Sequence, residues 1–327
     1  MSDMNHARVI LRSVSATSLT HAVEDCLTFC DWESWLPRNA VVVIKPNLCT
    51  AVPHQVLACN TDVALIEALC QALLTRTSRI YIGEAGHLRQ TPWQAFAASG
   101  YVEMAKRLGV ELVNFTESPA VKVRLDPAGE IAMPRQLLEA DAYINVPVLK
   151  THALTYFTGA LKNQWGCVPD CHDRLRYHRS INVLLSSIQR LLKPKFSLMD
   201  GIVGMEGRGP VAGEARRLDL ILASRDSVAL DATAMRLVGL DPLKSRHVVM
   251  AAQRGLGRIA AEDIDVDGEW DRLSTTFTPP PRDYANTAMF FATQYSWFIK
   301  YVLANDSLYF PVRDVVKFFR RLGVATK

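Results

Sequence analysis

Short apolar runs rich in β-branched residues alternate along this chain with segments of helical periodicity, and this alternation narrows the folds it can adopt. The run Ala40–Lys45 (AVVVIK) has no polar residue before its last position, which indicates a strand buried on both faces. Such strands are typical of a parallel sheet covered by helices. The segments that we predict as strands are Ala40–Lys45, Arg79–Gly83, Val110–Asn114, Ala142–Val148, Phe196–Asp200 and Leu218–Ala223.

Helical segments lie between these runs. Thr61–Leu74 opens on Thr and Asp, and its apolar residues then recur at the spacing of one helical face. Ile181–Leu192 and Ser227–Val238 have the same pattern, with Asp226 or Ser227 as the predicted N-cap of the latter. Alternating strands and helices predict an α/β doubly wound fold, with a mainly parallel sheet and helices on both faces.

Composition excludes several other classes. The 327 residues are 49% hydrophobic, and 37 Lys and Arg against 33 Asp and Glu leave a net charge of only +4. A disordered chain would be less apolar and more highly charged, and a nucleic-acid-binding protein would show clustered basic residues. We therefore expect a soluble globular protein, most simply an enzyme, with no nucleic-acid partner.

Cysteine usage and the apolar segments bear on location. The seven cysteines are scattered, and no secretory signal precedes them, so we predict a reduced, cytoplasmic protein without a disulfide framework. The uncharged stretch 284–299 is too short and too polar to cross a bilayer, so we expect no transmembrane segment.

The character of the chain changes after about Trp270. Pro279, Pro280 and Pro281 indicate a linker or rigid turn, and residues 284–327 then hold eleven of the 27 aromatic residues. We predict an α/β domain over 1–270 and, over 271–327, a Pro-rich linker with a helical, aromatic-rich extension. That extension packs on the main domain, forms a dimer or partner contact through 284–327, or touches a membrane surface.

Polar residues follow the ends of the predicted strands. Ligands of open parallel α/β sheets bind beyond the carboxyl ends of the strands, so these residues predict a shared polar cleft. Each also has a simpler interpretation: Lys45 as a snorkelling side chain, Asn47 as a turn residue, Asp226 as an N-cap. The residues are Lys45, Asn47, Glu84, Lys150, Thr151, His152, Asp200, Glu206, Arg208 and Asp226.

Two further segments stand out. Gly201–Gly213 is rich in glycine but matches neither the dinucleotide nor the P-loop pattern, so we predict a loop approaching a ligand, or a mobile lid with Glu206 and Arg208 at its tip. Between Lys150 and His178, Cys167 and Cys171 lack a second ligand pair, so a structural zinc site is not expected, although another transition-metal site stays open. In the same segment we predict that a flexible loop aims Lys162 and Asn163 inward.

Several motifs resemble the domain-of-unknown-function family 362 over about residues 38–260. They are KPNL at 45–48, IGE at 82–84, AFAASGY at 95–101, NVPVLKTH at 145–152, ALKNQWG at 160–166, DGIVGMEGRGPVAG at 200–213 and SRDSVALDA at 224–232. The resemblance implies a fold and a cleft but no reaction. Many relatives carry a ferredoxin-like module with closely spaced cysteines, which this chain lacks, so no iron–sulfur cluster is implied.

The order and spacing of His152, Lys162 and His178 are also similar to those of the nickel-pincer lactate racemase family. In that family the lysine carries the cofactor covalently and the later histidine ligates nickel. The glycine pair that precedes the family's lysine is replaced here by TGALK. We therefore do not expect a covalent nickel-pincer cofactor on Lys162.

These residues predict an enzyme that acts on a small anionic organic substrate by Lys/His acid–base chemistry, such as isomerisation or elimination, with proton abstraction beside a carbonyl as the first choice. The predicted catalytic residues are His152 (the acid/base), Lys162, Lys150 and Asn163; the substrate-binding residues are Lys45, Asn47, Arg208 and Thr151; and the ligands of a divalent metal, if one assists, are Glu84, Asp200, Glu206, Asp226 and His178. One alternative is a metal-linked redox enzyme or accessory protein that uses Cys167–His178. Another is a non-catalytic binding module. The sequence does not fix the cofactor.

Overall fold

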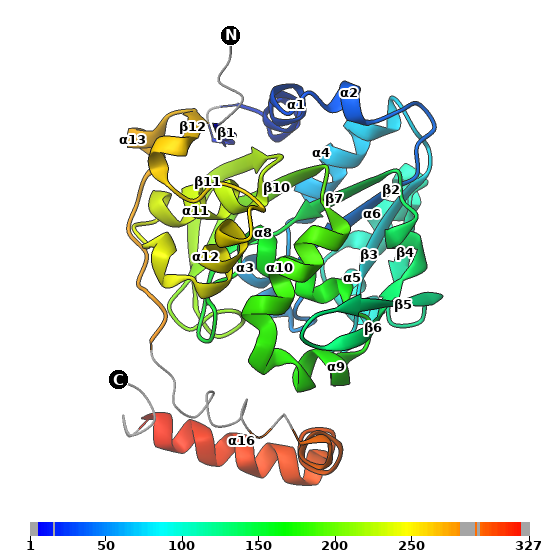
Figure 1. Ribbon diagram of the computed structural model, residues 1–327, viewed down its shortest axis with the longest axis vertical. Helices are drawn as coiled ribbons and strands as arrows, with labels where there is room; N and C mark the ends of the chain where they lie inside the picture. The colour runs from blue at the N-terminus through cyan, green and yellow to red at the C-terminus, as the bar shows by residue number, and fades with distance from the viewer. Residues whose placement is uncertain (1–5, 16, 282–291, 293–294, 322–327) are drawn as a thin grey trace.

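The computed structural model describes residues 6–15, 17–281, 292 and 295–321. A ten-stranded mixed sheet crosses the molecule in the order β12-β1-β11-β10-β7-β2-β3-β4, and β8 and β9 extend from β10 (Figure 1). A separate hairpin joins β5 to β6. The strands are β1 (Ala7–Ser13), β2 (Val42–Pro46), β3 (Ile80–Glu84), β4 (Glu111–Asn114), β5 (Ala120–Leu125), β6 (Gly129–Pro134), β7 (Ala142–Val146), β8 (Val148–His152), β9 (Tyr156–Phe157), β10 (Phe196–Glu206), β11 (Glu214–Ser224) and β12 (Ile264–Asp267).

Most neighbouring strands of the sheet are parallel. β2 pairs in parallel with β3 and β7, β3 with β4, and β10 with β7 and β8. β11 is the main exception, since it runs antiparallel to both β10 and β1. The predicted α/β fold with a mainly parallel, doubly covered sheet is confirmed.

Alternate residues of the central strands enter cores on opposite faces of the sheet. Val42 and Ile44 pack in the cluster that holds Leu65 of α4, whereas Val43 between them packs with Leu184 of α10. Burial on both faces explains the uninterrupted apolar run of β2.

The helices are α1 (Leu19–Phe29), α2 (Trp32–Trp35), α3 (Val56–Cys59), α4 (Val63–Leu74), α5 (Pro92–Ala98), α6 (Tyr101–Leu108), α7 (Arg135–Leu138), α8 (Gly159–Asn163), α9 (Cys171–Arg176), α10 (Ile181–Leu192), α11 (Ser227–Leu237), α12 (Arg246–Gln253), α13 (Trp270–Leu273), α15 (Ser296–Phe298) and α16 (Asp306–Arg321), with short 3₁₀ turns between several of them and a π-helical turn η6 (Ile299–Leu303).

Two predicted boundaries differ from the structure. The run Ala142–Val148 is divided into β7 and β8 around Pro147, which has no N–H to donate to a ladder. The predicted glycine-rich loop Gly201–Gly213 is for its first half a strand, because β10 continues to Glu206 and pairs with β11 as a long hairpin. Glu206 is thus fixed in the sheet rather than at the tip of a lid.

Five strands were not predicted: β1, β5, β6, β9 and β12. β1 lies in the N-terminal stretch that we considered only for a secretory signal, and it pairs with β11 on one side and with β12 on the other. The β5–β6 hairpin alternates exposed and buried residues, so no continuous apolar run marks it. The edge strand β12 and the half-exposed hairpin lack a continuous apolar run, whereas β1 lies inside the sheet and its short buried run at residues 9–11 was not recognised as a strand.

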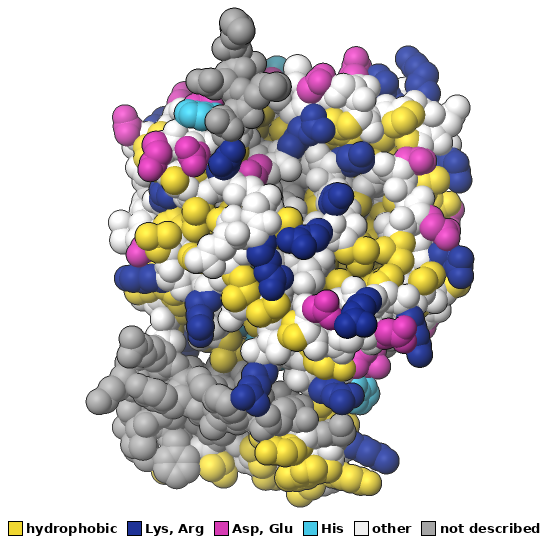
Figure 2. Space-filling model, viewed as in Figure 1, with side chains coloured by type: hydrophobic (Ala, Val, Ile, Leu, Met, Phe, Trp, Pro, Cys, Tyr) yellow, Lys and Arg dark blue, Asp and Glu magenta, His cyan; other side chains and the backbone are white. Residues whose placement is uncertain are grey.

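The C-terminal extension lies at the foot of the view in Figure 1, and residues 274–281, which form no helix or strand, lead toward it. Figure 2 shows hydrophobic side chains gathered there, while Lys and Arg are interspersed with Asp and Glu over the rest of this face. The described part of the extension is helical, as predicted, and Trp297, Tyr301 and Phe318 are exposed on it. Phe290, Phe291 and the side chain of Phe319 lie outside the described residues.

None of the single helices in the described residues is both long and apolar enough to cross a membrane. One bent pair, Pro53–Cys59 with Val63–Leu74, meets that test by length and composition alone.

Candidate functional site

Two adjoining cavities lie beyond the carboxyl ends of β2, β3 and β8, where α8, the 3₁₀ turn η2 (Gln164–Cys167) and α9 cross the sheet edge. The outer cavity has a volume of about 380 Å³ and the inner one about 80 Å³. His87, Lys162, Trp165 and Arg174 line both cavities, so the two form one continuous site. The sequence placed a polar cleft at this edge, and the structure puts many of the predicted residues here.

A buried ion pair forms the floor of the inner cavity. Lys45 Nζ lies 2.7 Å from Glu84 Oε2 and also donates to the carbonyl oxygen of Pro46 at 2.7 Å. The Glu84 carboxylate further accepts from the backbone N–H groups of Leu48 and Ala85. The charge of Lys45 is therefore balanced by Glu84 within the protein, and Lys45 holds the Glu84 carboxylate in place instead of binding an anionic ligand.

A glycine allows the chain to pass directly over this ion pair. A Cβ atom at Gly166 would lie 2.5 Å from Glu84 Oε1 and 2.8 Å from Lys45 Nζ. Any other residue would displace one of the two charged groups. The motif NQWG therefore fits the close approach of η2 to the ion pair.

Lys150 holds a second buried network. Its ammonium group donates to Asn47 Oδ1 at 2.8 Å, to the carbonyl oxygen of Cys59 at 2.7 Å and to Cys49 Sγ at 3.1 Å. Asn47 in turn donates to Asn163 Oδ1 at 3.0 Å. Asn163 thus links the strand ends to α8, and Asn47 and Lys150 serve this network rather than projecting alone into the cleft.

Lys162 lies on helix α8, not on the flexible loop that we predicted. Gly159 begins this helix with a φ of +60°, and its missing Cβ leaves space for the buried carboxylate of Asp231. Asp231 accepts from the N–H groups of Ala160 at 2.5 Å and Leu161 at 3.0 Å. The carboxyl group of Asp231, as the acceptor at the N-terminus of α8, fixes the turn that aims Lys162 at the site.

The amine of Lys162 faces both cavities, and no described residue forms a hydrogen bond or ion pair with it. Burial lowers the pKa of Lys162 to about 7, and the charges of Lys150, Arg174 and Lys45 act in the same direction. The neutral amine is therefore abundant at neutral pH. A neutral amine in a cavity is a competent base or nucleophile.

His152 presents one defined ring nitrogen to the outer cavity. Its Nδ1 accepts from the N–H groups of Leu154 at 3.1 Å and Thr155 at 3.3 Å. Burial, with the charge of Lys162, holds the pKa of His152 well below its usual range, so the ring is neutral. With Nδ1 an acceptor, the proton of the neutral ring is on Nε2, which makes that nitrogen a donor.

The charged side chains that line the outer cavity are all basic. Arg89, Lys162 and Arg174 line it together with His152 and His178, and no Asp or Glu is among its described lining residues. Arg174 is 7% exposed; it donates to the carbonyl oxygen of Gly86, but its Nε has no partner among the described groups. Burial lowers the pKa of His178 to about 3, so this ring adds no charge. The electrostatics favour an anionic ligand.

The C-terminal extension supplies part of the outer wall. Leu303 and Tyr309 line the outer cavity. Arg89 connects them to the body, since it donates to the carbonyl oxygen of Leu303 at 2.7 Å and lies 4.0 Å from the ring centroid of Tyr309.

Several predicted site residues lie elsewhere. Thr151 donates to the carbonyl oxygens of Met205 and Gly207, and it lines neither cavity, as is also true of Arg208. Asp200 accepts from the N–H groups of Asp62 and Ile202, and Glu206 bonds Arg216 and the N–H of Thr278. Thr151, Asp200 and Glu206 hold the β10–β11 hairpin and its surroundings in place.

Asp226 lies at the opposite edge of the sheet. Because β11 is antiparallel to β10, its carboxyl end points away from the cleft, and the rule for parallel strands does not apply to it. Asp226 caps α11 by accepting from the N–H groups of Val228 and Ala229. It borders a separate surface cavity with Arg8 and Arg258.

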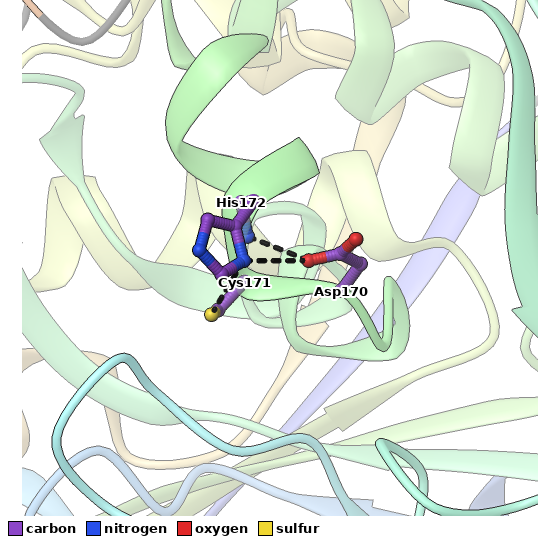
Figure 3. A group of neighbouring side chains, drawn as sticks. All are labelled: Asp170, Cys171 and His172. Atoms are coloured by element: carbon purple, nitrogen blue, oxygen red, sulfur yellow. Dashed lines mark hydrogen bonds and ion pairs between the residues drawn. The ribbon is translucent and has the colours of Figure 1, made fainter. Parts of the chain in front are cut away.

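The five predicted metal ligands do not converge. Glu84 is in the inner cavity and His178 in the outer one, while Asp200, Glu206 and Asp226 have the separate partners given above. Within the described residues, the one group of three candidate ligands whose atoms lie within 4.8 Å of one another is Asp170, Cys171 and His172 (Figure 3). Cys167 lies apart from it, buried against the hydroxyl group of Tyr143.

Sequence reasoning missed Arg174 and Cys49 of the site, and it noted His87 and Asp231 near strand ends without giving them a role. His87 and Cys49 each follow a predicted strand within three or four residues, so their positions carried a usable signal. Arg174 reaches the site from α9 and Asp231 from α11, and no local pattern marks either contact. Only the tertiary structure brings these two side chains to Lys162.

Comparison with known proteins gives a matching family, a similar curated protein and a solved structure of limited similarity. A family model described as a domain of unknown function, DUF362, matches residues 42–236. The thylakoid-associated protein sll1697 of Synechocystis sp. is 27% identical over 228 residues, which are 68% of this chain and 70% of that protein. The lactate racemase apoprotein of Thermoanaerobacterium thermosaccharolyticum has a TM-score of 0.47 at 13% identity; the match covers 73% of this chain and 59%, less than two thirds, of that one.

Proposed function

The chain belongs to the DUF362 family, as its motifs predicted, and since that family has no assigned reaction we propose a function from the site itself. We propose an enzyme that removes and returns a proton beside the carbonyl group of a small carboxylate. The observation that carries the proposal is an outer cavity lined by Lys162, Arg174 and Arg89 with no described Asp or Glu among its lining residues.

Arg174 and Arg89 support binding of the carboxylate. A guanidinium group recognises a carboxylate by paired hydrogen bonds, and the Nε of Arg174 has no partner within the described protein. Burial also lowers the pKa of Arg174, as expected for a cation that lacks sufficient counter-charge in its pocket. A bound anion would supply that charge.

Lys162 is the proposed base. Its neutral amine takes the proton from the carbon beside the carbonyl, and the electron pair of the broken C–H bond passes to the carbonyl oxygen as an enolate. His152 Nε2–H donates a hydrogen bond to that oxygen, as a neutral imidazole can. This assigns His152 a stabilising role and gives the acid–base role that we expected of it to Lys162.

The outcome then depends on where the proton returns. Return to the same carbon from the other side inverts its configuration, return to a neighbouring atom moves the carbonyl group, and departure of a group from the next carbon is elimination. All three outcomes begin with the same removal of a proton by Lys162.

Exchange of carbon-bound hydrogen for deuterium tests the proposal without knowledge of the natural substrate. The protein is incubated in D₂O with a panel of 2-oxo and 2-hydroxy carboxylates, pyruvate and lactate among them, and loss of the C–H signal is followed by NMR. We expect protein-dependent exchange with at least one member, reduced about 100-fold or more by Lys162→Met. Lys195→Met, at an exposed position, is the matched control. Exchange that survives Lys162→Met would contradict the role of Lys162.

A metal-dependent reaction is the second candidate. Neutral imidazole is the form that binds metals, and His152 and His178 line the outer cavity beside Lys162. The Asp170–Cys171–His172 group adds a candidate site, and Cys171 lines the same cavity. Elemental analysis and intact mass of the purified protein decide the matter: a stoichiometric transition metal, or added mass on Lys162, supports this candidate.

The C-terminal extension is proposed as a contact between two copies of this chain. We keep the division into an α/β domain over 1–270 and an extension over 271–327. The side chains of Trp297 and Phe318 are 58% and 59% exposed, which leaves aromatic surface to cover. Sedimentation analysis of the protein and of Trp297→Ser/Phe318→Ser tests the proposal, since only the former would form dimers.

We also propose a cytoplasmic location. It follows from the scattered unpaired cysteines, and the relative described as thylakoid-associated sets a clear alternative. Fractionation of cells into soluble and membrane material distinguishes the two locations.

A further inference from the structure

Cys49 lies beside the inner cavity in the loop between β2 and the 3₁₀ turn η1 (Pro53–Gln55). It is one of two partly exposed cysteines, Cys171 being the other, while the remaining five are buried. The backbone N–H of Cys49 donates to Asn60 Oδ1 at 2.9 Å, and its Sγ lies 3.1 Å from Lys150 Nζ. The residue lines the inner cavity with Lys162 and Arg174.

The charge of Lys150 requires a partner, and one of its hydrogen-bond acceptors can ionise. Lys150 is 1% exposed and has three hydrogen-bond acceptors, which match the three donors of an ammonium group. Two of these acceptors are the Asn47 amide oxygen and the Cys59 carbonyl oxygen, which cannot ionise. A buried cation without a counter-charge is strongly disfavoured, and the Cys49 sulfur is the one of these three acceptors that can ionise.

The pKa of Cys49 agrees with this arrangement. A hydrogen bond with the side chain of Cys59, together with the Lys150 charge, lowers the pKa of Cys49 despite its burial. Burial instead raises the pKa of Cys171. The two accessible thiols of the chain therefore differ in protonation at neutral pH.

The cavity beside Cys49 has a second feature that indicates a ligand. Arg174 is 7% exposed, lines the same cavity and has an unpartnered Nε. Because the inner and outer cavities share four lining residues, a carboxylate held by Arg174 could place its neighbouring carbon near the sulfur of Cys49.

We propose that Cys49 is a nucleophile of this site, held as a thiolate by Lys150, and that it adds reversibly to the carbonyl carbon of a small 2-oxo carboxylate. In this step the S–C bond forms, the carbonyl π pair moves to oxygen, and the oxygen takes a proton from an ammonium group of the site, so that a thiohemiacetal or thiohemiketal results. Reversal breaks the S–C bond and returns the proton. The step needs neither oxidant nor reductant. It rests on the proposed function only for the class of ligand.

Alkylation of the full-length, reduced protein tests the thiolate. The reductant is removed under argon, iodoacetamide is added, and each cysteine is followed by peptide mass mapping. We expect Cys49 to react about tenfold or more faster than Cys171 at pH 7, with the midpoint of its pH–rate profile below the ordinary thiol value of about 8.5. Lys150→Met should slow Cys49 about tenfold at pH 7 and move the midpoint upward, whereas Lys195→Met should change neither.

Competition with glyoxylate, the smallest 2-oxo carboxylate, tests the addition. We expect glyoxylate to slow the alkylation of Cys49 and to leave that of Cys171 unchanged. Modification of Cys171 before Cys49, an ordinary midpoint for Cys49 in the unmutated protein, or failure of glyoxylate to protect Cys49 would each overturn the proposal. The midpoint and the protection are measured on the unmutated chain, so they decide the matter even where Lys150→Met does not fold. If deuterium exchange fails while Cys49 is still alkylated rapidly and glyoxylate still slows that alkylation, only the base role of Lys162 is overturned.

Discussion

Lys45 and Glu84 form an ion pair of 2.7 Å between two almost wholly buried side chains at the ends of adjacent parallel strands. Arg107 and Glu67 form a pair of the same length on the surface. The two pairs differ chiefly in exposure to water, and exposure decides how much each contributes to stability.

Glu84→Gln is expected to lower the free energy of unfolding by about 3 kcal/mol, because it leaves the Lys45 ammonium buried without a counter-charge. Glu67→Gln, the matched surface control, should leave stability unchanged. Denaturant unfolding of the three proteins measures both effects. Equal losses in the two variants would contradict the importance that we assign to burial.

Gly166→Ala is expected to destabilise the protein by about 1 to 3 kcal/mol, because its Cβ would enter the space of Glu84 and Lys45. Gly109→Ala is a useful comparison, since nothing lies within 4 Å of its would-be Cβ and its φ is +70°. That variant should lose only about 1 kcal/mol of stability, through backbone strain at the positive φ. Thermal unfolding compares them, and carboxylate binding should weaken in Gly166→Ala alone.

The rate of deuterium exchange should rise with pH and reach half of its plateau near pH 7, where Lys162 loses its proton. Stability should follow the same group. The pKa of Lys162 is about 7 in the folded chain and about 10.4 in the unfolded chain. Between these two pH values only the unfolded chain keeps the proton, so the free energy of unfolding increases as the pH rises. Below pH 7 the cost of the buried charge is complete.

Lys162→Met should remove the rise of stability above pH 7. It should also stabilise the protein at pH 7 by about 2 kcal/mol, which is less than the full pKa shift implies because water in the cavity screens the charge. Unfolding of both proteins across the pH range gives the comparison. A variant less stable than the parent at pH 7 would show that the amine is not an uncompensated cation.

Asp231 gives the opposite dependence on pH. Burial raises the pKa of Asp231 to about 8, although two backbone N–H groups favour its charged form. The folded chain therefore holds this proton more tightly than the unfolded chain, and stability contributed by the protonated carboxyl is lost as the pH rises from about 4 through 8. Asp231→Asn should abolish that loss.

Asp231→Ala should also cost about 2 kcal/mol at any pH through two unpaired N–H groups, and it should slow exchange by loosening the turn that aims Lys162. Circular dichroism and the exchange assay measure the two effects separately. Full exchange activity in a folded Asp231→Ala protein would argue against a positioning role.

The sequence predicted those site residues whose strands are parallel. Lys45 and Glu84 follow central parallel strands, so the rule that ligands bind beyond their carboxyl ends found both. The same rule failed for Asp226, because no local signal shows that β11 is antiparallel to β10. Asp200 and Glu206 were misplaced for a related reason: β10 continues past the predicted end of the strand, and both side chains pair within the hairpin and its surroundings.

Other features depend on contacts between distant parts of the chain. Arg174 and Asp231 touch the site only because α9 and α11 return to it. The thiolate of Cys49 depends on Lys150, about one hundred residues away, and a single sequence does not reveal such a pairing. The sheet core was predictable because burial on both faces leaves a continuous apolar run, whereas the half-exposed β5–β6 hairpin leaves none.

Leu303 and Tyr309 form part of the outer wall of the cavity, yet both lie beyond the residues that match the family model. The reacting groups and the wall thus come from separate stretches of chain that can change independently in evolution. Proteins that share residues corresponding to 42–236 but carry a different C-terminal extension would keep one chemistry while exchanging the surface that selects the substrate. Substrate preference in such a family would then follow the C-terminal extension rather than the α/β domain.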